Sequence, residues 1–145
     1  MNKSMHLGRA GEHLVTSILL KECRDVYLPA VDDHGVDMLV RTVQTSNPYQ
    51  YQKIQVKTLQ GVTPNNSGGL FAAISCPNPA PNYWFVFYIK DIDIMWLINS
   101  LDFVNIASKN KKGKNIGKYS LGLANKKGPR SQFTQYIITD FSKLP

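Results

Sequence analysis

Two short stretches decide how this chain is expected to fold: Gly35-Val36-Asp37-Met38-Leu39-Val40 and Ile54-Gln55-Val56-Lys57. Successive side chains of a strand point to opposite faces of a sheet, so the apolar residues of the first stretch alternate with Asp37. In the second stretch, Gln55 and Lys57 leave the strand on the same side because one residue separates them. Asn47-Pro48 between the stretches is typical of a turn, so we expect a hairpin of strands over 36–44 and 51–59.

A helix is predicted before this hairpin, over residues 4–23. Ser4 is its expected N-cap. The apolar residues recur at helical spacing, at Leu7, Ala10, Leu14 and Ile18. At about 100° per residue, Glu12 lies roughly 120° from the centre of that apolar stripe, at its edge. At this position a side chain can contact a sheet and still point into a cleft.

The remaining chain is expected to alternate short strands with two further helices. Apolar runs predict strands over 25–30, 70–75, 83–89, 92–98 and 119–123. A short helix is predicted over 101–108. A final amphipathic helix, capped by Ser131, is predicted from the spacing of Phe133, Tyr136, Ile137, Phe141 and Leu144. With 145 residues, 43% of them hydrophobic, and no repeat or long linker, the chain is expected to form a single domain over residues 1–145.

The net charge of +7 is concentrated in one segment. Residues 103–139 contain no Asp or Glu, while the rest of the chain has nine basic and ten acidic residues. The segment holds eight basic residues, Lys109, Lys111, Lys112, Lys114, Lys118, Lys126, Lys127 and Arg130. Local positive charge attracts polyanions and supplies sequence-independent affinity for phosphates. The alternative is a solvated loop that only aids solubility.

Cysteine content and hydropathy point to a reduced, cytoplasmic protein without a membrane partner. Cys23 and Cys76 have no zinc or redox spacing. No signal peptide is expected at the start of the sequence. The most apolar stretch, 83–89, is too short to span a bilayer. Its aromatic residues, with those of the next strand, are expected in the core or a dimer interface: Tyr83, Trp84, Phe85, Phe87 and Trp96.

The order of a helix carrying Glu12, a strand opened by Gly-x-Asp at Asp37, and a strand carrying Gln55 and Lys57 resembles the PD-(D/E)XK nuclease superfamily. This superfamily includes Holliday junction resolvases and Mrr-type restriction nucleases. The motifs that support the resemblance cover residues 5–60. The resemblance implies an α/β fold, with a restriction endonuclease-like mixed β-sheet flanked by helices. An N-terminal helix would be followed by a β-meander that carries the site.

The resemblance also implies a role for each of the four residues. Asp37 matches the metal-binding aspartate, Gln55 the variable acidic position, Lys57 the catalytic lysine and Glu12 the glutamate of the first helix. Val36 stands where the family name has Pro. Gln55 stands where Asp or Glu is usual, as in Mrr-like members with Gln-x-Lys. A Gln carbonyl oxygen can ligate Mg²⁺ but brings no charge, so metal affinity is expected to be weaker than with a carboxylate.

The implied activity is hydrolysis of DNA phosphodiester bonds with Mg²⁺, for which Mn²⁺ would substitute. Asp37, the Gln55 side-chain oxygen and the Val56 carbonyl would hold the ion. Lys57 would orient the attacking water, and Glu12 would hold an outer-shell water or a second ion. A homodimer is expected, because two strands need two cuts and one domain of this size carries one site.

Each of these residues also has a purely structural interpretation. Glu12 favours the positive end of its helix dipole. Asp37 is also typical of a turn. Gln55 and Lys57 would equally suit an exposed strand face.

Two other functions also fit the sequence. One is a catalytically inactive nucleic-acid-binding module on the same fold. It remains an alternative because Gln55 brings no charge to the site. The other is a partner-binding protein whose basic segment meets an acidic protein surface. The residues just before Gly35 could add a metal ligand or a general base, or form a hydrated turn: Asp32, Asp33 and His34.

Overall fold

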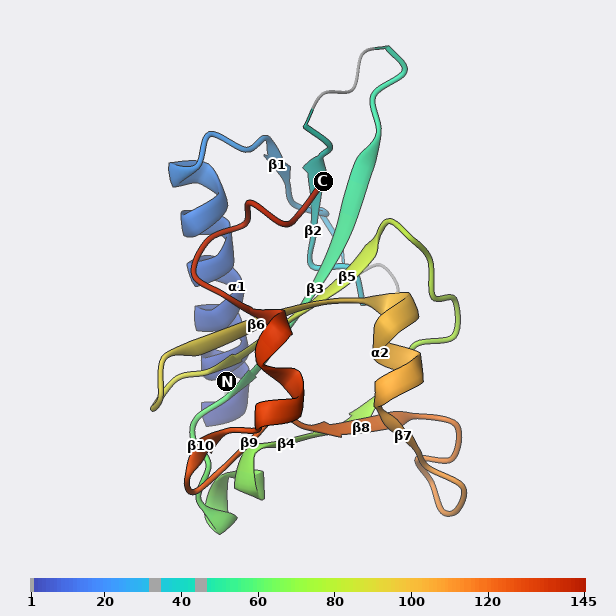
Figure 1. Ribbon diagram of the computed structural model, residues 1–145. Coiled ribbons are helices and arrows are strands. Elements are labelled where there is room, and N and C mark those ends of the chain that lie inside the picture. The colour runs from blue at the N-terminus through green and yellow to red at the C-terminus, as the bar shows by residue number, and fades with distance from the viewer. Residues whose placement is uncertain (1, 32–34, 44–46) are drawn as a thin grey trace.

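A six-stranded mixed sheet forms the centre of the protein, seen in a computed structural model that describes residues 2–31, 35–43 and 47–145 (Figure 1). Its strands, in spatial order, are β1 (Val26–Tyr27), β2 (Met38–Arg41), β3 (Tyr51–Leu59), β5 (Tyr83–Ile89), β6 (Ile94–Asn99) and β11 (Ile137–Ile138). The β3–β5 pair is parallel, and the other neighbouring pairs are antiparallel. The predicted mixed α/β fold, with a helix followed by a β-meander of β1, β2 and β3, is confirmed.

The N-terminal helix α1 (Lys3–Lys21) precedes the meander. Its N-cap is Asn2, whose side-chain oxygen accepts a hydrogen bond from the Met5 amide at 2.9 Å. The prediction of Ser4 as the cap is wrong, because Ser4 lies inside the helix and its hydroxyl donates to the Asn2 side chain at 2.8 Å. The helix therefore starts one residue earlier than its apolar spacing indicates.

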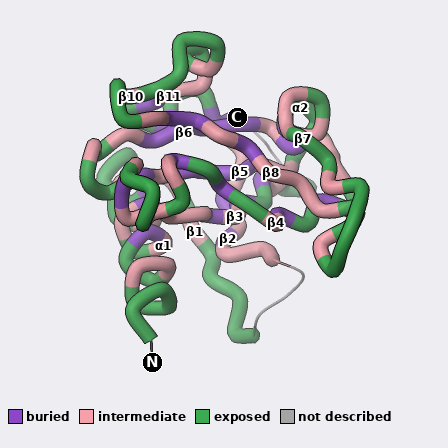
Figure 2. The backbone as a smooth tube through the Cα atoms, turned by 90° about the horizontal axis from the view of Figure 1, so that it is seen from below, coloured by how far each residue is buried: buried purple, intermediate pink, exposed green. Residues whose placement is uncertain are grey.

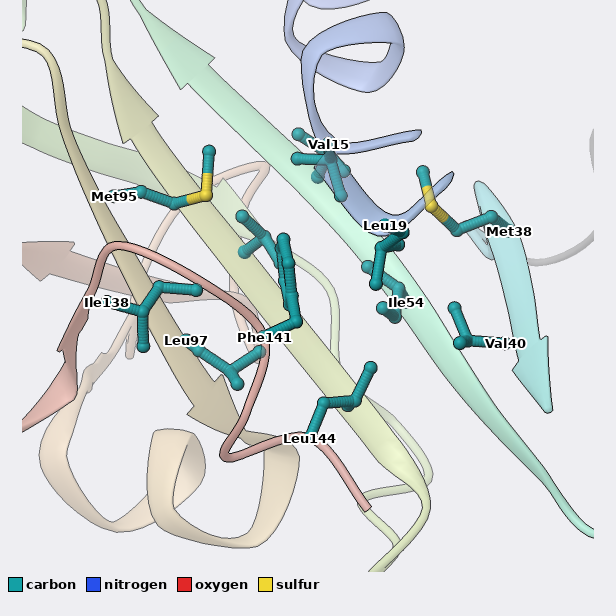
Figure 3. Close-up of a cluster of buried hydrophobic side chains, with 12 residues drawn as sticks. Val15, Leu19, Met38, Val40, Ile54, Met95, Leu97, Ile138, Phe141 and Leu144 are labelled. Carbon is teal, nitrogen blue, oxygen red and sulfur yellow. The ribbon is translucent and has the colours of Figure 1, made fainter. Parts of the chain in front are cut away.

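Helix α1 and the C-terminal residues cover one face of the central sheet (Figure 3). The apolar positions of α1 and the inward side chains of the strands form a single buried cluster there, made of Val15, Leu19, Met38, Val40, Ile54, Val56, Val86, Met95, Leu97, Ile138, Phe141 and Leu144. The C-terminal residues are tied to the end of α1 by polar bonds. Arg24 donates to the Leu144 carbonyl at 3.1 Å, and Glu22 accepts from the Phe141 amide at 2.9 Å.

The opposite face is covered by smaller elements around an aromatic core. They are the helix α2 (Ser100–Ile106), a three-stranded sheet of β4 (Leu70–Ile74), β8 (Tyr119–Gly122) and β7 (Ser108–Lys109), and the hairpin of β9 (Ala124–Asn125) and β10 (Gly128–Pro129). A 3-10 turn, Pro64–Gly69, leads into β4. Phe103 of α2 packs on Phe85 of β5 with their ring centroids 4.6 Å apart. Buried residues gather in the central strands, whereas the loops at the rim are exposed (Figure 2).

The predicted C-terminal helix is wrong. A 3-10 turn (Ser131–Tyr136) and the short strand β11 stand in its place, and Arg130 rather than Ser131 precedes the turn. Phe133 and Tyr136 pack against the aromatic core, but Phe141 belongs to the cluster under α1. The chain thus crosses from one face of the sheet to the other, which one continuous helix could not do.

The other elements follow the prediction with shifted ends. The strand expected over 25–30 is only Val26–Tyr27, and the helix expected over 101–108 is α2. None of the helices in the described ranges has the length and hydropathy that crossing a bilayer requires.

Candidate functional site

Asp37 lies at the point where β2 parts from β3. Its amide donates to the carbonyl of Ile54, the residue that pairs with Met38, at 2.9 Å. Its carboxylate oxygen Oδ2 then accepts the Val56 amide at 2.6 Å. The carboxylate therefore takes the place that a backbone carbonyl would occupy if β2 were longer.

This arrangement brings a carboxylate beside a backbone carbonyl. The amide and carbonyl of one strand residue project toward the same neighbouring strand. Because the Val56 amide faces Asp37, the Val56 carbonyl also projects from β3 on the Asp37 side. Two oxygen ligands for a cation, the Asp37 carboxylate and the Val56 carbonyl, are thus available at the start of β2.

Gln55 lies on the aromatic face of the sheet, directly before Val56, whose amide binds the Asp37 carboxylate. Its side-chain oxygen Oε1 accepts a hydrogen bond from the Tyr83 hydroxyl at 2.9 Å. Its amide nitrogen packs on Gly35, where an added Cβ would lie 2.8 Å from Nε2. Gly35 also has a φ of +79°, a conformation that favours glycine, so this position resists substitution on both counts. The Gln55 amide is therefore held at its oxygen by Tyr83, while its nitrogen lies close to Gly35.

The Tyr83 hydroxyl remains protonated over the physiological range. Burial raises the pKa of Tyr83 to about 12, and negative charge on Cys76 and Asp37 acts on it in the same direction. Tyr83 consequently acts as a hydrogen-bond donor to Gln55.

Glu12 and Asp37 line the same cavity, of about 480 Å³, between α1 and residues 28–31 and 36–38. Glu12 is brought there by close packing of α1 on β3, since a Cβ at Gly11 would come closer than 3.0 Å to the Thr58 hydroxyl oxygen. The Glu12 carboxylate accepts from the Arg9 guanidinium at 3.0 Å. The Arg9 side chain is 70% exposed, so this ion pair contributes little to stability.

Gln55 and Lys57 do not belong to the lining of that cavity. They share the other face of β3, where Gln55 is in register with Phe85 and Lys57 with Phe87. Asp37 therefore stands between two groups, with Glu12 on the cavity side and Gln55 on the side of the aromatic core. Lys57 is half-buried and one step further along the same face as Gln55.

The basic residues of segment 103–139 lie in or beside the short strands of the smaller sheets, with Lys109 in β7 and Arg130 directly after β10. The β7–β8 loop carries four of the eight, Lys111, Lys112, Lys114 and Lys118, and the β9–β10 turn carries Lys126 and Lys127. None of these residues lines the cavity beside Asp37. The loop residues Lys111, Lys112 and Lys114 are all exposed.

Within the described residues, no group of three or more His, Cys, Asp or Glu side chains could hold a metal ion. Asp32, Asp33 and His34 lie outside the described residues. The oxygen donors near β2 are instead one carboxylate, one amide and one backbone carbonyl. Oxygen ligands of this kind suit hard cations such as Mg²⁺.

The polar role of Tyr83 is not evident from the sequence, which predicts this residue in the core or in a dimer interface. Its hydroxyl reaches Gln55 because β3 and β5 pair in parallel, although the two residues are 28 positions apart in the sequence. One signal for this role is present in the sequence. A tyrosine that opens an otherwise apolar strand needs a partner for its hydroxyl.

Comparison with known proteins identifies the fold. No protein-family model matches the chain, and no curated protein matches it. The solved structure of a bacterial homing endonuclease, I-Ssp6803I, is similar to this chain with a TM-score of 0.62 and 13% sequence identity. The similarity covers 94% of this chain and 89% of that one. The chain therefore has a nuclease-like α/β fold, in which an N-terminal helix precedes a mixed sheet.

Proposed function

We propose that this protein is a metal-dependent endonuclease of the PD-(D/E)XK type that hydrolyses phosphodiester bonds of DNA. The observation that carries the proposal is the position of Asp37. Its carboxylate binds the Val56 amide, on the side of β3 to which the Val56 carbonyl also projects, and Val56 directly follows Gln55 in the chain. This constellation occurs on a fold similar to that of a homing endonuclease.

The residues present fit a Mg²⁺ or Mn²⁺ ion. We assign Asp37, Gln55 and the Val56 carbonyl as its ligands. A carboxylate offers about four lone-pair sites and an amide oxygen two, so both groups can accept their present hydrogen bonds and still ligate an ion. A single charged ligand implies weak affinity in the absence of DNA, whose phosphates would complete the coordination.

The bound ion would polarise the scissile phosphate and acidify a water molecule. The protein's own groups would do the rest. Lys57 would donate a hydrogen bond that orients the attacking water and offset negative charge on the phosphate oxygens. Glu12 would accept a hydrogen bond from a second water in the cavity beside Asp37, or ligate a second ion.

We place the DNA contacts on the basic loops and propose a homodimer. The exposed lysines of the β7–β8 loop would bind the phosphate backbone without reading sequence. A duplex has two strands, so two copies of one site would cut both. The domain carrying this site would span residues 1–145.

A plasmid-nicking assay tests the proposal. We expect supercoiled DNA to be nicked with Mg²⁺ or Mn²⁺ and to stay intact with EDTA. Asp37→Asn and Lys57→Ala should each lower the rate by about 100-fold or more. Lys53→Ala is the matched control, because Lys53 lies on the same strand and face but is exposed. Cleavage that persists in both site variants would come from a contaminant and would end the proposal.

One observation favours a second candidate, a nucleic-acid-binding module without catalysis. Gln55 carries no charge and its oxygen already accepts the Tyr83 hydroxyl. This candidate predicts that the protein retards DNA in a gel at low salt but never nicks it with either ion. Gln55→Glu would then leave the protein inactive, whereas in an active nuclease it should keep or strengthen metal binding.

A further inference from the structure

The Tyr83–Gln55 pair lies where the proposed metal site meets the aromatic core. A glutamine can turn its side-chain amide by 180° and so present either an oxygen or an NH₂ group to a neighbour. Only the oxygen can ligate a cation. A site that uses Gln in place of Asp or Glu therefore needs a device that fixes the amide, which a carboxylate with two equivalent oxygens does not need.

The Gln55 amide lies between the Tyr83 hydroxyl and Gly35. The Tyr83 hydroxyl donates to Oε1 at 2.9 Å. On the other side, Gly35 leaves room for the Nε2 group, which an added Cβ would approach to 2.8 Å. The Tyr83 ring is itself held by Phe85, with the two ring centroids 5.3 Å apart.

We infer that Tyr83 is a positioning residue, whose hydroxyl selects the amide orientation in which the Gln55 oxygen can bind a divalent cation. The inference rests on the proposed function, because it assigns the role of Tyr83 toward the metal of that same site. The Tyr83 hydroxyl is then needed for metal binding as long as residue 55 is Gln. It is no longer needed when a carboxylate replaces the Gln55 amide.

A double-mutant cycle tests this inference by metal affinity, measured calorimetrically with Mn²⁺ and the full chain in the absence of DNA. Tyr83→Phe should weaken Mn²⁺ binding by about 10-fold, the usual effect of removing a group that orients a metal ligand. In the Gln55→Glu background, the same change should alter the affinity by no more than about twofold, the margin of ordinary non-additivity.

Tyr88→Phe is the matched control. Tyr88 lies on the same strand, and its hydroxyl donates to Asp93 at 2.7 Å, away from the site. It should leave Mn²⁺ affinity unchanged, which separates the loss of a tyrosine hydroxyl from the loss of this one. The Phe substitution keeps the ring, and circular dichroism of each variant verifies that it folds.

The possible outcomes lead to different conclusions. Equal affinity of wild type and Tyr83→Phe would overturn the positioning role and leave the nuclease proposal intact. An equal loss in the wild-type and Gln55→Glu backgrounds would also overturn it, because the hydroxyl would then act on the fold and not on the amide. Wild-type protein that binds no Mn²⁺ and nicks no DNA would overturn both the inference and the proposed function.

Discussion

Helix α1 reaches the sheet through Gly11, and substitution of this glycine gives the sharpest prediction about the fold. A Cβ at Gly11 would come closer to the Thr58 hydroxyl oxygen than the 3.0 Å that real Cβ atoms respect. Gly8 lies in the same helix, and a Cβ there would meet nothing within 4 Å. Both glycines therefore lie inside helix α1, but only Gly11 lies close to another element of the protein.

The expected magnitude follows from comparing the two alanine variants. Gly to Ala inside a helix stabilises by about 1 kcal/mol, and this gain is common to both. Overpacking of a close contact costs about 1–3 kcal/mol, and it applies to Gly11 alone. Since the clash lies well inside the contact limit, we expect the Gly11→Ala variant to be about 3 kcal/mol less stable than the Gly8→Ala variant. For a chain of this size, that is a difference of roughly 10 °C in Tm.

The assay is thermal and urea unfolding followed by circular dichroism. A rescue variant identifies the atom responsible. Among the described residues, the buried Thr58 hydroxyl oxygen has no hydrogen-bond partner, so Thr58→Ala should cost little and should restore most of the stability of Gly11→Ala. If both glycine variants melt together, or if Thr58→Ala gives no rescue, then α1 does not pack on β3 through this contact. The packing that brings Glu12 to the cavity beside Asp37 would then be absent as well.

Three further predictions concern the site, the basic loop and pH. Asp37→Ala should lower the free energy of unfolding by about 1–3 kcal/mol in urea titrations, because the Val56 amide loses its acceptor, whereas Asp37→Asn should lose less; equal losses would contradict the bond. Neutralising the exposed loop lysines Lys111, Lys112 and Lys114 should weaken the dependence of DNA affinity on salt. The slope of log K against log salt concentration should fall by about 0.9 for each phosphate that these lysines neutralise in the wild type. The exposed lysines Lys3, Lys21 and Lys90 are the control set. The pKa of Tyr83 is raised from 10 to about 12 in the folded state. The contribution of its bound proton to the free energy of unfolding is therefore complete below pH 10 and is lost as pH rises toward 12. Tyr83→Phe should therefore lose less stability between pH 9 and pH 11 than wild type in urea titrations, and a parallel decline would exclude this linkage.

The sequence alone determined the features that depend on local geometry. Gln55 and Lys57 share a face of β3 because the period of a strand is fixed by its covalent structure. The hairpin of β2 and β3 and the helix α1 followed from apolar periodicity and turn residues, which act over a few positions. The concentration of positive charge between residues 103 and 139 is likewise a property of the sequence.

Only the tertiary structure decided which distant residues meet. The parallel pairing of β3 with β5 brings Tyr83 to Gln55, and the early end of β2 lets the Asp37 carboxylate replace a backbone carbonyl. The C-terminal residues that resembled a helix instead divide between two cores on opposite faces of the sheet. Such contacts depend on how whole elements pack against one another, and spacing within a short stretch of sequence carries no information about them.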